Sequence, residues 1–226
     1  MPAPFRPEEF WAARLGCPPS DFVRGFSVVL HPRPGAVYVF ATASAVVVAA
    51  PEGLHARLRA VADARSLLVP ETLRALLPPT AVLVGPARIA YLRRELAEPG
   101  GVVRLASATD PRLEALRGAV TALEWRHANL DAAEPPLFGR EAGGRVAAAA
   151  GFERLLERVA HLGVVSEPGQ RARGLGRAVV QAAAARALEL GLAAQYQTLA
   201  SNTPALRVAA ALGFEPYATT LAARLE

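Results

Sequence analysis

A glycine-rich run between two apolar segments carries the clearest chemistry in this sequence. It reads Gln170-Arg171-Ala172-Arg173-Gly174-Leu175-Gly176-Arg177. The flanking pattern predicts a strand before it and a helix that begins near Gly174. Glycine lets a backbone approach a ligand closely, and the first amides of a helix are unpaired donors at the positive end of its dipole. With three arginines beside it, the run is suited to hold a diphosphate. The alternative is a glycine-rich turn with solvated arginines.

Two other phosphate-binding loops fit this run poorly. In a Rossmann loop the third small residue would fall at Val179, and the next expected strand, Ala194–Leu199, has no acid to bind a ribose hydroxyl. A P-loop needs a lysine, and all 25 basic residues of this chain are arginine. The same absence excludes a Schiff-base lysine.

The C-terminal part has a regular order of expected elements. Apolar periodicity and turn residues predict the strands 102–105, 137–140, 145–152, 158–165, 194–199 and 217–225. They also predict helices over 111–120, capped by Asp110, over 125–131, from about Gly174 to a left-handed Gly191, and from Asn202 or Thr203 to Gly213.

The first hundred residues are rich in proline and contain no motif that identifies them. Strands are expected over 26–30, 37–40, 45–48 and 81–84, a helix over 54–62 and a short helix near Leu92. A hinge at Pro99-Gly100-Gly101 predicts two domains, residues 1–101 and 102–226.

Composition limits the classes of protein. Of the 226 residues, 52% are hydrophobic, and neither a secretory leader nor a membrane-spanning stretch is expected, so a cytoplasmic location is the default. The single cysteine and the dispersed His31, His55 and His127 give no metal-ligand spacing. Arginines are scattered and aromatic residues make up only 6%, so neither a nucleic-acid nor a membrane partner is expected.

Two motifs carry a resemblance to a known family. Arg171-x-x-Gly174-x-Gly176 resembles the R-x-x-G-x-G/A signature of the GNAT superfamily of acyl-CoA-dependent N-acyltransferases, and the segment from Asn202 to Gly213-Phe214 is similar to its N-x-x-A…G-F segment. The resemblance covers the chain from about Val102 onward. It implies an α+β fold with a mixed, mostly antiparallel sheet flanked by helices, here preceded by a small α/β unit.

The resemblance also implies a ligand and a reaction. Acetyl-CoA would lie between the strands 158–165 and 194–199. Backbone groups of Val164, Val165 and Ser166 would bind its pantetheine arm, the amides of Arg171, Ala172, Arg173, Gly174, Leu175, Gly176 and Arg177 its diphosphate, and Asn202 the pantetheine region. A primary amine of a small molecule or peptide would attack the thioester directly. A homodimer is left open.

The catalytic groups are less well marked. His161 is the first candidate for a general base, because its ordinary pKa of ~6.5 suits proton abstraction; a histidine bonded to the backbone is the alternative. Glu153 is second and a water chain third. Ala209 stands where many members of the family have a tyrosine as general acid; Tyr196 and Tyr217 are possible substitutes, with packed aromatics as the alternative, and the thiolate can also be protonated by water.

Other interpretations remain open. Glu124, Asp131 and Glu134 lie where the family binds its acceptor, and would attract a cationic amine or simply be solvated. Ala209 motivates a non-catalytic acyl-CoA-binding or regulatory module as the alternative function. A basic nucleic-acid-binding protein is a third interpretation, and it predicts affinity that falls steeply with salt.

Overall fold

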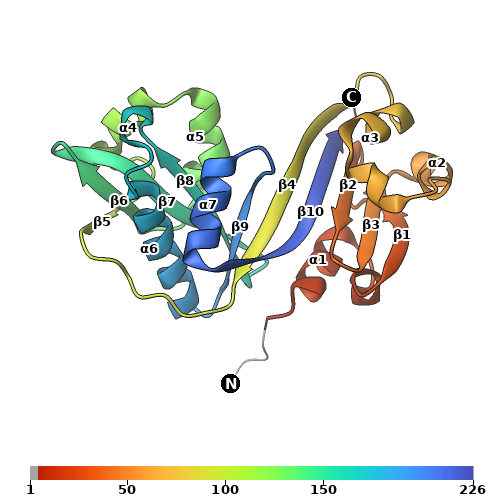
Figure 1. Cartoon of the computed structure of the whole chain (residues 1–226), viewed down its shortest axis with the longest axis horizontal. Helices are drawn as coiled ribbons and strands as arrows, with labels where there is room; N and C mark the ends of the chain where they lie inside the picture. The colour runs from red at the N-terminus through yellow and green to blue at the C-terminus, as the bar shows by residue number, and fades with distance from the viewer. Residues whose placement is uncertain (1–4, 226) are drawn as a thin grey trace. The chain divides into compact units, whose positions relative to one another are not determined.

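The computed structural model describes residues 5–225, and internal contacts divide them into two units (Figure 1). The first unit holds the described residues up to Ile89, the segment Thr198–Asn202, and the chain from Pro216 onward. The second holds Ala90–Gln197 and Thr203–Glu215. The expected boundary lay near residue 101, whereas the contacts assign residues 90–101 to the second unit and the last strand to the first.

The first unit is built on a sheet with the strand order β1-β3-β2-β10-β4. Its strands are β1 (Gly25–Leu30), β2 (Ala36–Ala41), β3 (Ala45–Ala50), β10 (Phe214–Arg224) from Pro216 onward, and β4 (Val82–Leu92) up to Ile89. β1 and β3 are parallel, whereas β2 is antiparallel to both β3 and β10. Every residue of β3 is buried, which requires cover on both faces of the sheet.

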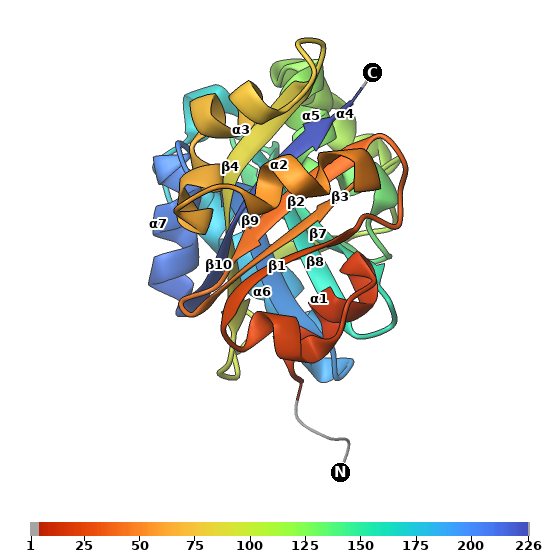
Figure 2. The same ribbon diagram turned by 90° about the vertical axis from the view of Figure 1, so that its right-hand side faces the viewer.

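Helices supply that cover (Figure 2). On one face, α2 (His55–Arg59) and α3 (Pro70–Leu76) contribute Leu58 and Leu73 to a cluster with the strand valines. On the other face, α1 (Pro7–Leu15) places Trp11 against Phe40, with ring centroids 4.6 Å apart. The first unit is therefore a sheet packed between two helical layers.

The second unit has the strand order β4-β9-β8-β7-β6-β5. Its strands are the end of β4 (Val82–Leu92), β5 (Val102–Leu105), β6 (Leu137–Ala142), β7 (Arg145–Leu155), β8 (Val159–Ser166) and β9 (Ala193–Leu199). The pairs from β5 to β8 are antiparallel, and β8 and β9 are parallel. Its helices are α4 (Glu114–Ala119), α5 (Ala122–Ala128), α6 (Leu175–Glu189) and α7 (Thr203–Leu212). This mixed, mostly antiparallel sheet with flanking helices confirms the predicted fold class.

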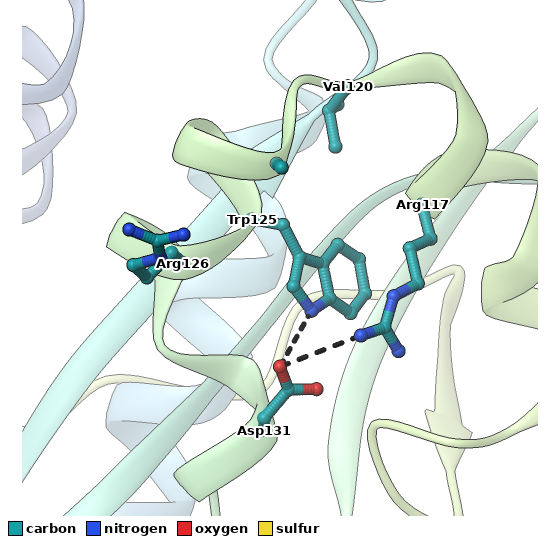
Figure 3. A pocket seen from close by; sticks show the side chains of 6 residues that line it. Arg117, Val120, Trp125, Arg126 and Asp131 are labelled. Carbon is teal, nitrogen blue, oxygen red and sulfur yellow. Dashed lines mark hydrogen bonds and ion pairs between the residues drawn. The ribbon is translucent and has the colours of Figure 1, made fainter.

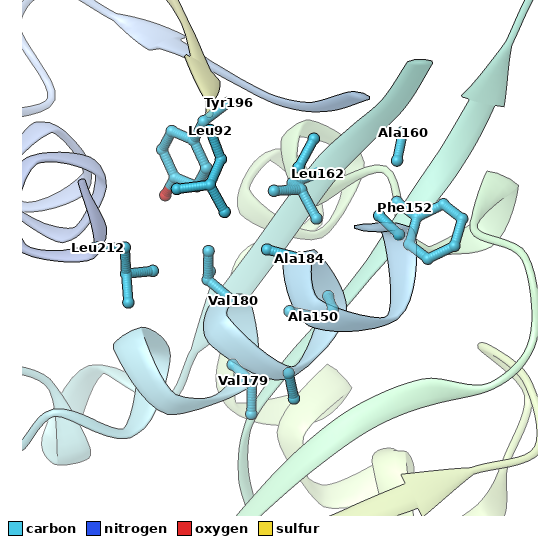
Figure 4. Close-up of a cluster of buried hydrophobic side chains, with 14 of the residues drawn as sticks. Leu92, Ala150, Phe152, Ala160, Leu162, Val179, Val180, Ala184, Tyr196 and Leu212 are labelled. Carbon is cyan, nitrogen blue, oxygen red and sulfur yellow. The ribbon is translucent and has the colours of Figure 1, made fainter. Parts of the chain in front are cut away.

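Small residues let α6 lie close to its sheet (Figure 4). Val179, Val180 and Ala184 of α6 are fully buried against Ala150 of β7 and Leu162 of β8. The helix ends as predicted, because Gly191 adopts a left-handed conformation with φ of 73°. This packing fixes the start of α6 beside the end of β8.

Two local expectations were wrong or incomplete. No helix forms near Leu92, because β4 continues as a strand to that residue. The helix expected over 125–131 begins earlier, at Ala122, because Thr121 and Glu124 form a capping box, and it ends where Asn129 turns left-handed. Across residues 5–225, no helix combines the length and the apolarity needed to cross a membrane.

Candidate active site

The pairing between β8 and β9 ends part-way along β8. Parallel pairing runs from Val159 opposite Ala193 to Leu162 opposite Tyr196. β8 continues to Ser166 and stays paired with β7 along its whole length. From residue 163 to residue 166, β8 is therefore paired with β7 on one side only. Within the described residues, β9 does not pair with the other side of this segment. Val164, Val165 and Ser166, the three residues predicted to bind an extended ligand arm, form this open edge.

The glycine-rich loop presents backbone amides next to that edge. Gly174 begins α6 in a left-handed conformation with φ of 80°, and Ala172 is also left-handed at 62°. No side chain in the described part of the chain caps the first turn of α6. A Cβ placed on Gly176 would lie 3.0 Å from Ser166 Oγ, so the start of the helix lies directly against the end of β8. Unpaired amides and an open strand edge thus meet at one place.

The loop arginines have different environments. The Arg171 guanidinium donates to the Ser166 carbonyl at 3.2 Å and to Glu124 Oε1 at 2.5 Å, which joins the loop to α5. A hydrogen bond from the Thr121 amide, followed by the one from Arg171, lowers the pKa of Glu124 to about 2. Arg173 and Arg177 are exposed. The side chain of Arg171 thus serves the structure, while the other two remain at the solvent side of the loop.

These features fit a coenzyme A molecule. A diphosphate suits the uncapped start of a helix with left-handed residues before it and two exposed guanidinium groups beside it. Gln170 Oε1 is buried without a hydrogen-bond partner in residues 5–225, which is an unfilled polar position within the loop. Asn202, also predicted to bind the ligand, is exposed in the turn before α7. Its backbone amide donates to the Leu199 carbonyl at 3.0 Å.

The two base candidates lie side by side. Glu153 on β7 is the register partner of His161 on β8, so both side chains project from the same face of the sheet. His161 Nδ1 lies 2.9 Å from Gln195 Oε1, and Glu153 Oε2 accepts a hydrogen bond of 2.9 Å from Asn129 Nδ2. His161 is one residue before the last paired position of β8, so it stands at the base of the open edge.

The aromatic candidates are packed. Tyr196 is 4% exposed in the core below α6, with its ring 5.6 Å from that of Phe214, and burial raises its pKa to about 12 (Figure 4). Ala209 belongs to the same buried cluster. Tyr217 is half-buried in the first unit, 6.0 Å from Phe40.

The three acids expected on the acceptor side all have partners. Glu124 pairs with Arg171, and Glu134 accepts two hydrogen bonds from Arg154 at 2.8 and 3.0 Å. Asp131 accepts a hydrogen bond of 3.1 Å from Trp125 Nε1 at the edge of a pocket of about 460 Å³ (Figure 3). Arg117 lies over the Trp125 ring at 4.8 Å. Among residues 5–225, no group of three or more His, Cys, Asp or Glu is placed to hold a metal ion.

Sequence reasoning missed the residues that hold His161. Gln195 and Tyr91 are 1% and 2% exposed and were not singled out. The available signal was a glutamine inside an otherwise apolar strand, since a buried amide must find partners.

Comparisons with known proteins agree with this geometry. Residues 103–214 match the sequence model of the Acetyltransferase (GNAT) family. A structure from Novosphingobium aromaticivorans, described as an acetyltransferase of the GNAT family, shares the fold with 24% identity and a TM-score of 0.51, over 66% of this chain and 70% of that one. A GNAT-family acetyltransferase from Colwellia psychrerythraea has 19% identity and a TM-score of 0.49, over 69% of this chain and 62% of that one. No curated protein matches the chain. The resemblance carried by the two motifs is therefore confirmed: residues 103–214 form a domain of the GNAT family of acetyltransferases.

Proposed function

We propose that this chain transfers an acetyl group from acetyl-CoA to a primary amine of a small molecule or peptide. The observation that carries the proposal is the open edge of β8 beside the uncapped start of α6. An extended amide-containing arm and a diphosphate are the two ligand parts that such an edge and such a helix start would bind together.

Each part of the loop then has a role. Backbone groups of Val164, Val165 and Ser166 bond to the pantetheine arm as a neighbouring strand would. The amides from Arg171 to Arg177 bind the diphosphate, and the Arg173 and Arg177 side chains add positive charge.

A cationic amine loses two protons when it becomes an amide, whereas the leaving thiolate takes up only one. The reaction therefore releases one proton overall, and a base is needed to accept it. Acetyl-CoA supplies a thioester, so that when the amine nitrogen bonds to the acetyl carbon the carbon–sulfur bond breaks and its electron pair leaves on sulfur. An amine with a pKa of ~10.4 is a cation at neutral pH, and deprotonating it costs roughly 4 to 5 kcal/mol. Of the two protons that the nitrogen loses on becoming an amide, one passes to solvent before the attack, and His161 accepts the other as the carbon–nitrogen bond forms. The thiolate, with a pKa of ~8.5, takes its proton from water.

Glu153 is the second candidate for the base. It lies beside His161 on the next strand, and its Oε2 accepts a hydrogen bond from Asn129. Tyr196 is the candidate acid, although its hydroxyl is in the core and its raised pKa makes it a weak donor.

One pair of measurements tests the proposal. Calorimetry should show that coenzyme A binds to the full chain, and a thiol-release assay with acetyl-CoA over a broad amine panel should show turnover. Absence of binding at millimolar coenzyme A would refute the proposal. Binding without turnover on any amine would instead favour the non-catalytic acyl-CoA-binding module, which the buried Ala209 in place of a tyrosine motivates.

A further inference from the structure

A row of polar side chains crosses four neighbouring strands of the second unit. Glu153 of β7 is opposite His161 of β8, and His161 is opposite Gln195 of β9. β4, the neighbour of β9, adds Tyr91. Hydrogen bonds connect the row: Gln195 donates to the Tyr91 hydroxyl, and the Gln195 side-chain oxygen lies within hydrogen-bond distance of His161 Nδ1.

The alternation of the strands separates this row from the core. The next residues along the same strands, Leu92, Tyr196 and Leu162, all pack into the apolar cluster beneath α6 (Figure 4). Because successive side chains of a strand point to opposite faces, Tyr91, Gln195 and His161 project from the other face. One row of the sheet therefore stabilises the fold while the adjacent row is polar.

A buried polar row is costly unless it is fully bonded. Gln195 and Tyr91 are 1% and 2% exposed, and an apolar pair at these positions would avoid the desolvation cost of an amide and a phenol. Gln195 uses both ends of its amide: Nε2 donates to Tyr91 Oη at 2.6 Å, and Oε1 faces His161 Nδ1 at 2.9 Å. In this orientation the Gln195 oxygen, not its nitrogen, faces the imidazole of His161.

That orientation determines the proton position on His161. A carboxamide oxygen can only accept, so the ring nitrogen facing it, Nδ1, must carry the hydrogen. In the neutral ring the lone pair is then on Nε2, the nitrogen on the far side from Gln195. A base that takes a proton from an amine needs this lone pair.

We infer that Gln195, held by Tyr91, is a positioning residue that keeps His161 in the Nδ1–H form with Nε2 as the proton acceptor. This inference rests on the proposed function, since it gives His161 a proton to accept. In this inference Gln195 and Tyr91 act through the imidazole of His161, to which they are linked by hydrogen bonds.

The direct test is the tautomer of His161 in the full-length chain. Long-range ¹H–¹⁵N correlation spectra of histidine-labelled protein, at a pH two units above the ordinary histidine pKa of ~6.5, distinguish the two ring nitrogens. His161→Gln assigns the signals among the four histidines. We expect Nδ1–H for the native chain and a shift towards Nε2–H in Gln195→Leu, with a smaller shift in Tyr91→Phe. Nε2–H in the native chain, or an unchanged tautomer in Gln195→Leu, would overturn the inference.

Controls separate positioning from folding and from the proposed activity. Gln181→Leu makes the same chemical change on α6, where the amide donates to the Ala97 carbonyl, and should leave the His161 signals unchanged. On the best amine, Gln195→Leu should lose roughly 10- to 100-fold in kcat, within the range of general-base catalysis. An Nδ1–H ring in a chain that acetylates no amine would refute the proposed function and leave the positioning of His161 intact.

Discussion

Arg171 and Glu124 join the glycine-rich loop to helix α5. The guanidinium of Arg171 donates to Glu124 Oε1 and to the Ser166 carbonyl, and the other oxygen of Glu124 accepts from the Thr121 amide at 2.9 Å. The side chain of the signature arginine therefore bonds to the protein itself, and in the proposed complex only its backbone amide would bind the diphosphate.

Glu124→Gln tests this link through pH. The pKa of Glu124 is lowered to about 2, mainly by the Thr121 amide and then by Arg171, so the carboxylate contributes stability above its unfolded pKa of ~4.3 and loses it as the pH falls towards 2. We expect the native chain to be more stable than Glu124→Gln at pH 7, with the difference closing between about pH 4 and 2. Urea unfolding at several pH values measures it, and a difference independent of pH would contradict it.

Alanine substitutions at the two left-handed glycines that flank α6 test the role of its first turn. Gly174 and Gly191 stand at opposite ends of α6 with φ of 80° and 73°, and neither would place a Cβ within 4 Å of another atom. Alanine at either position should cost about 1 to 2 kcal/mol of unfolding free energy from backbone strain. Gly174→Ala alone should weaken coenzyme A binding at least tenfold in calorimetry. Equal affinities for the two variants would argue against the loop as the diphosphate site.

The exposed arginines of the loop predict the salt dependence of binding. Replacing Arg173 and Arg177 with alanine should raise the Kd of coenzyme A roughly tenfold, or ~1.4 kcal/mol, and flatten its dependence on salt. Alanine at the exposed Arg24 and Arg57 of the first unit makes the same change in net charge and should leave the Kd within twofold. If both double variants bind equally weakly, the effect is one of overall charge and the local assignment is wrong.

Tyr196→Phe distinguishes a packed aromatic from an acid. Burial raises the Tyr196 pKa to about 12, against ~10 when unfolded, so its stabilising effect is complete below pH 10 and is lost as the pH rises towards 12. We expect Tyr196→Phe to keep kcat within threefold and to lose less stability between pH 8 and 11 than the native chain. A hundredfold fall in kcat with an unchanged Tm would identify Tyr196 as the acid.

Gly163 of β8 lies directly against the backbone of α5 at Ala128. A Cβ at this position would lie 1.7 Å from the Ala128 carbonyl oxygen. Because this oxygen belongs to the backbone, no side-chain rotation can relieve the clash. Gly163→Ala should cost about 3 kcal/mol or more and lower the Tm by roughly 6 to 12 °C. Gly118→Ala, within α4 and with nothing within 4 Å, should be neutral or slightly stabilising in the same thermal scan.

Local signals in the sequence were enough for much of this unit. The glycine spacing at Gly174 and Gly176, the caps and the apolar periodicity predicted the loop and its helix, because all of these depend on neighbouring residues, and the family resemblance of the two motifs implied the fold class. The end of β4 was misjudged because a short apolar run such as 89–92 has no period that separates a strand from a helix.

The bonds that hold His161 depend on distant residues. Tyr91 and Gln195 are 104 positions apart, and their hydrogen bond exists only once β4 and β9 are neighbours. No spacing within a segment encodes that pairing. The base could therefore be named as a candidate from the sequence, but its supporting residues could not.

The alternation of β9 makes the turn before it intolerant of length changes. Deleting one residue at Leu190–Leu192 and shifting the strand by one position would carry the Gln195 amide into the apolar layer beneath α6 and turn the Tyr196 ring out of it. The buried amide of Gln195 and the exposed ring of Tyr196 would both destabilise the fold, and a substitution at one of these positions would not compensate for the other. This short connection should therefore resist the insertions and deletions that surface loops usually accept.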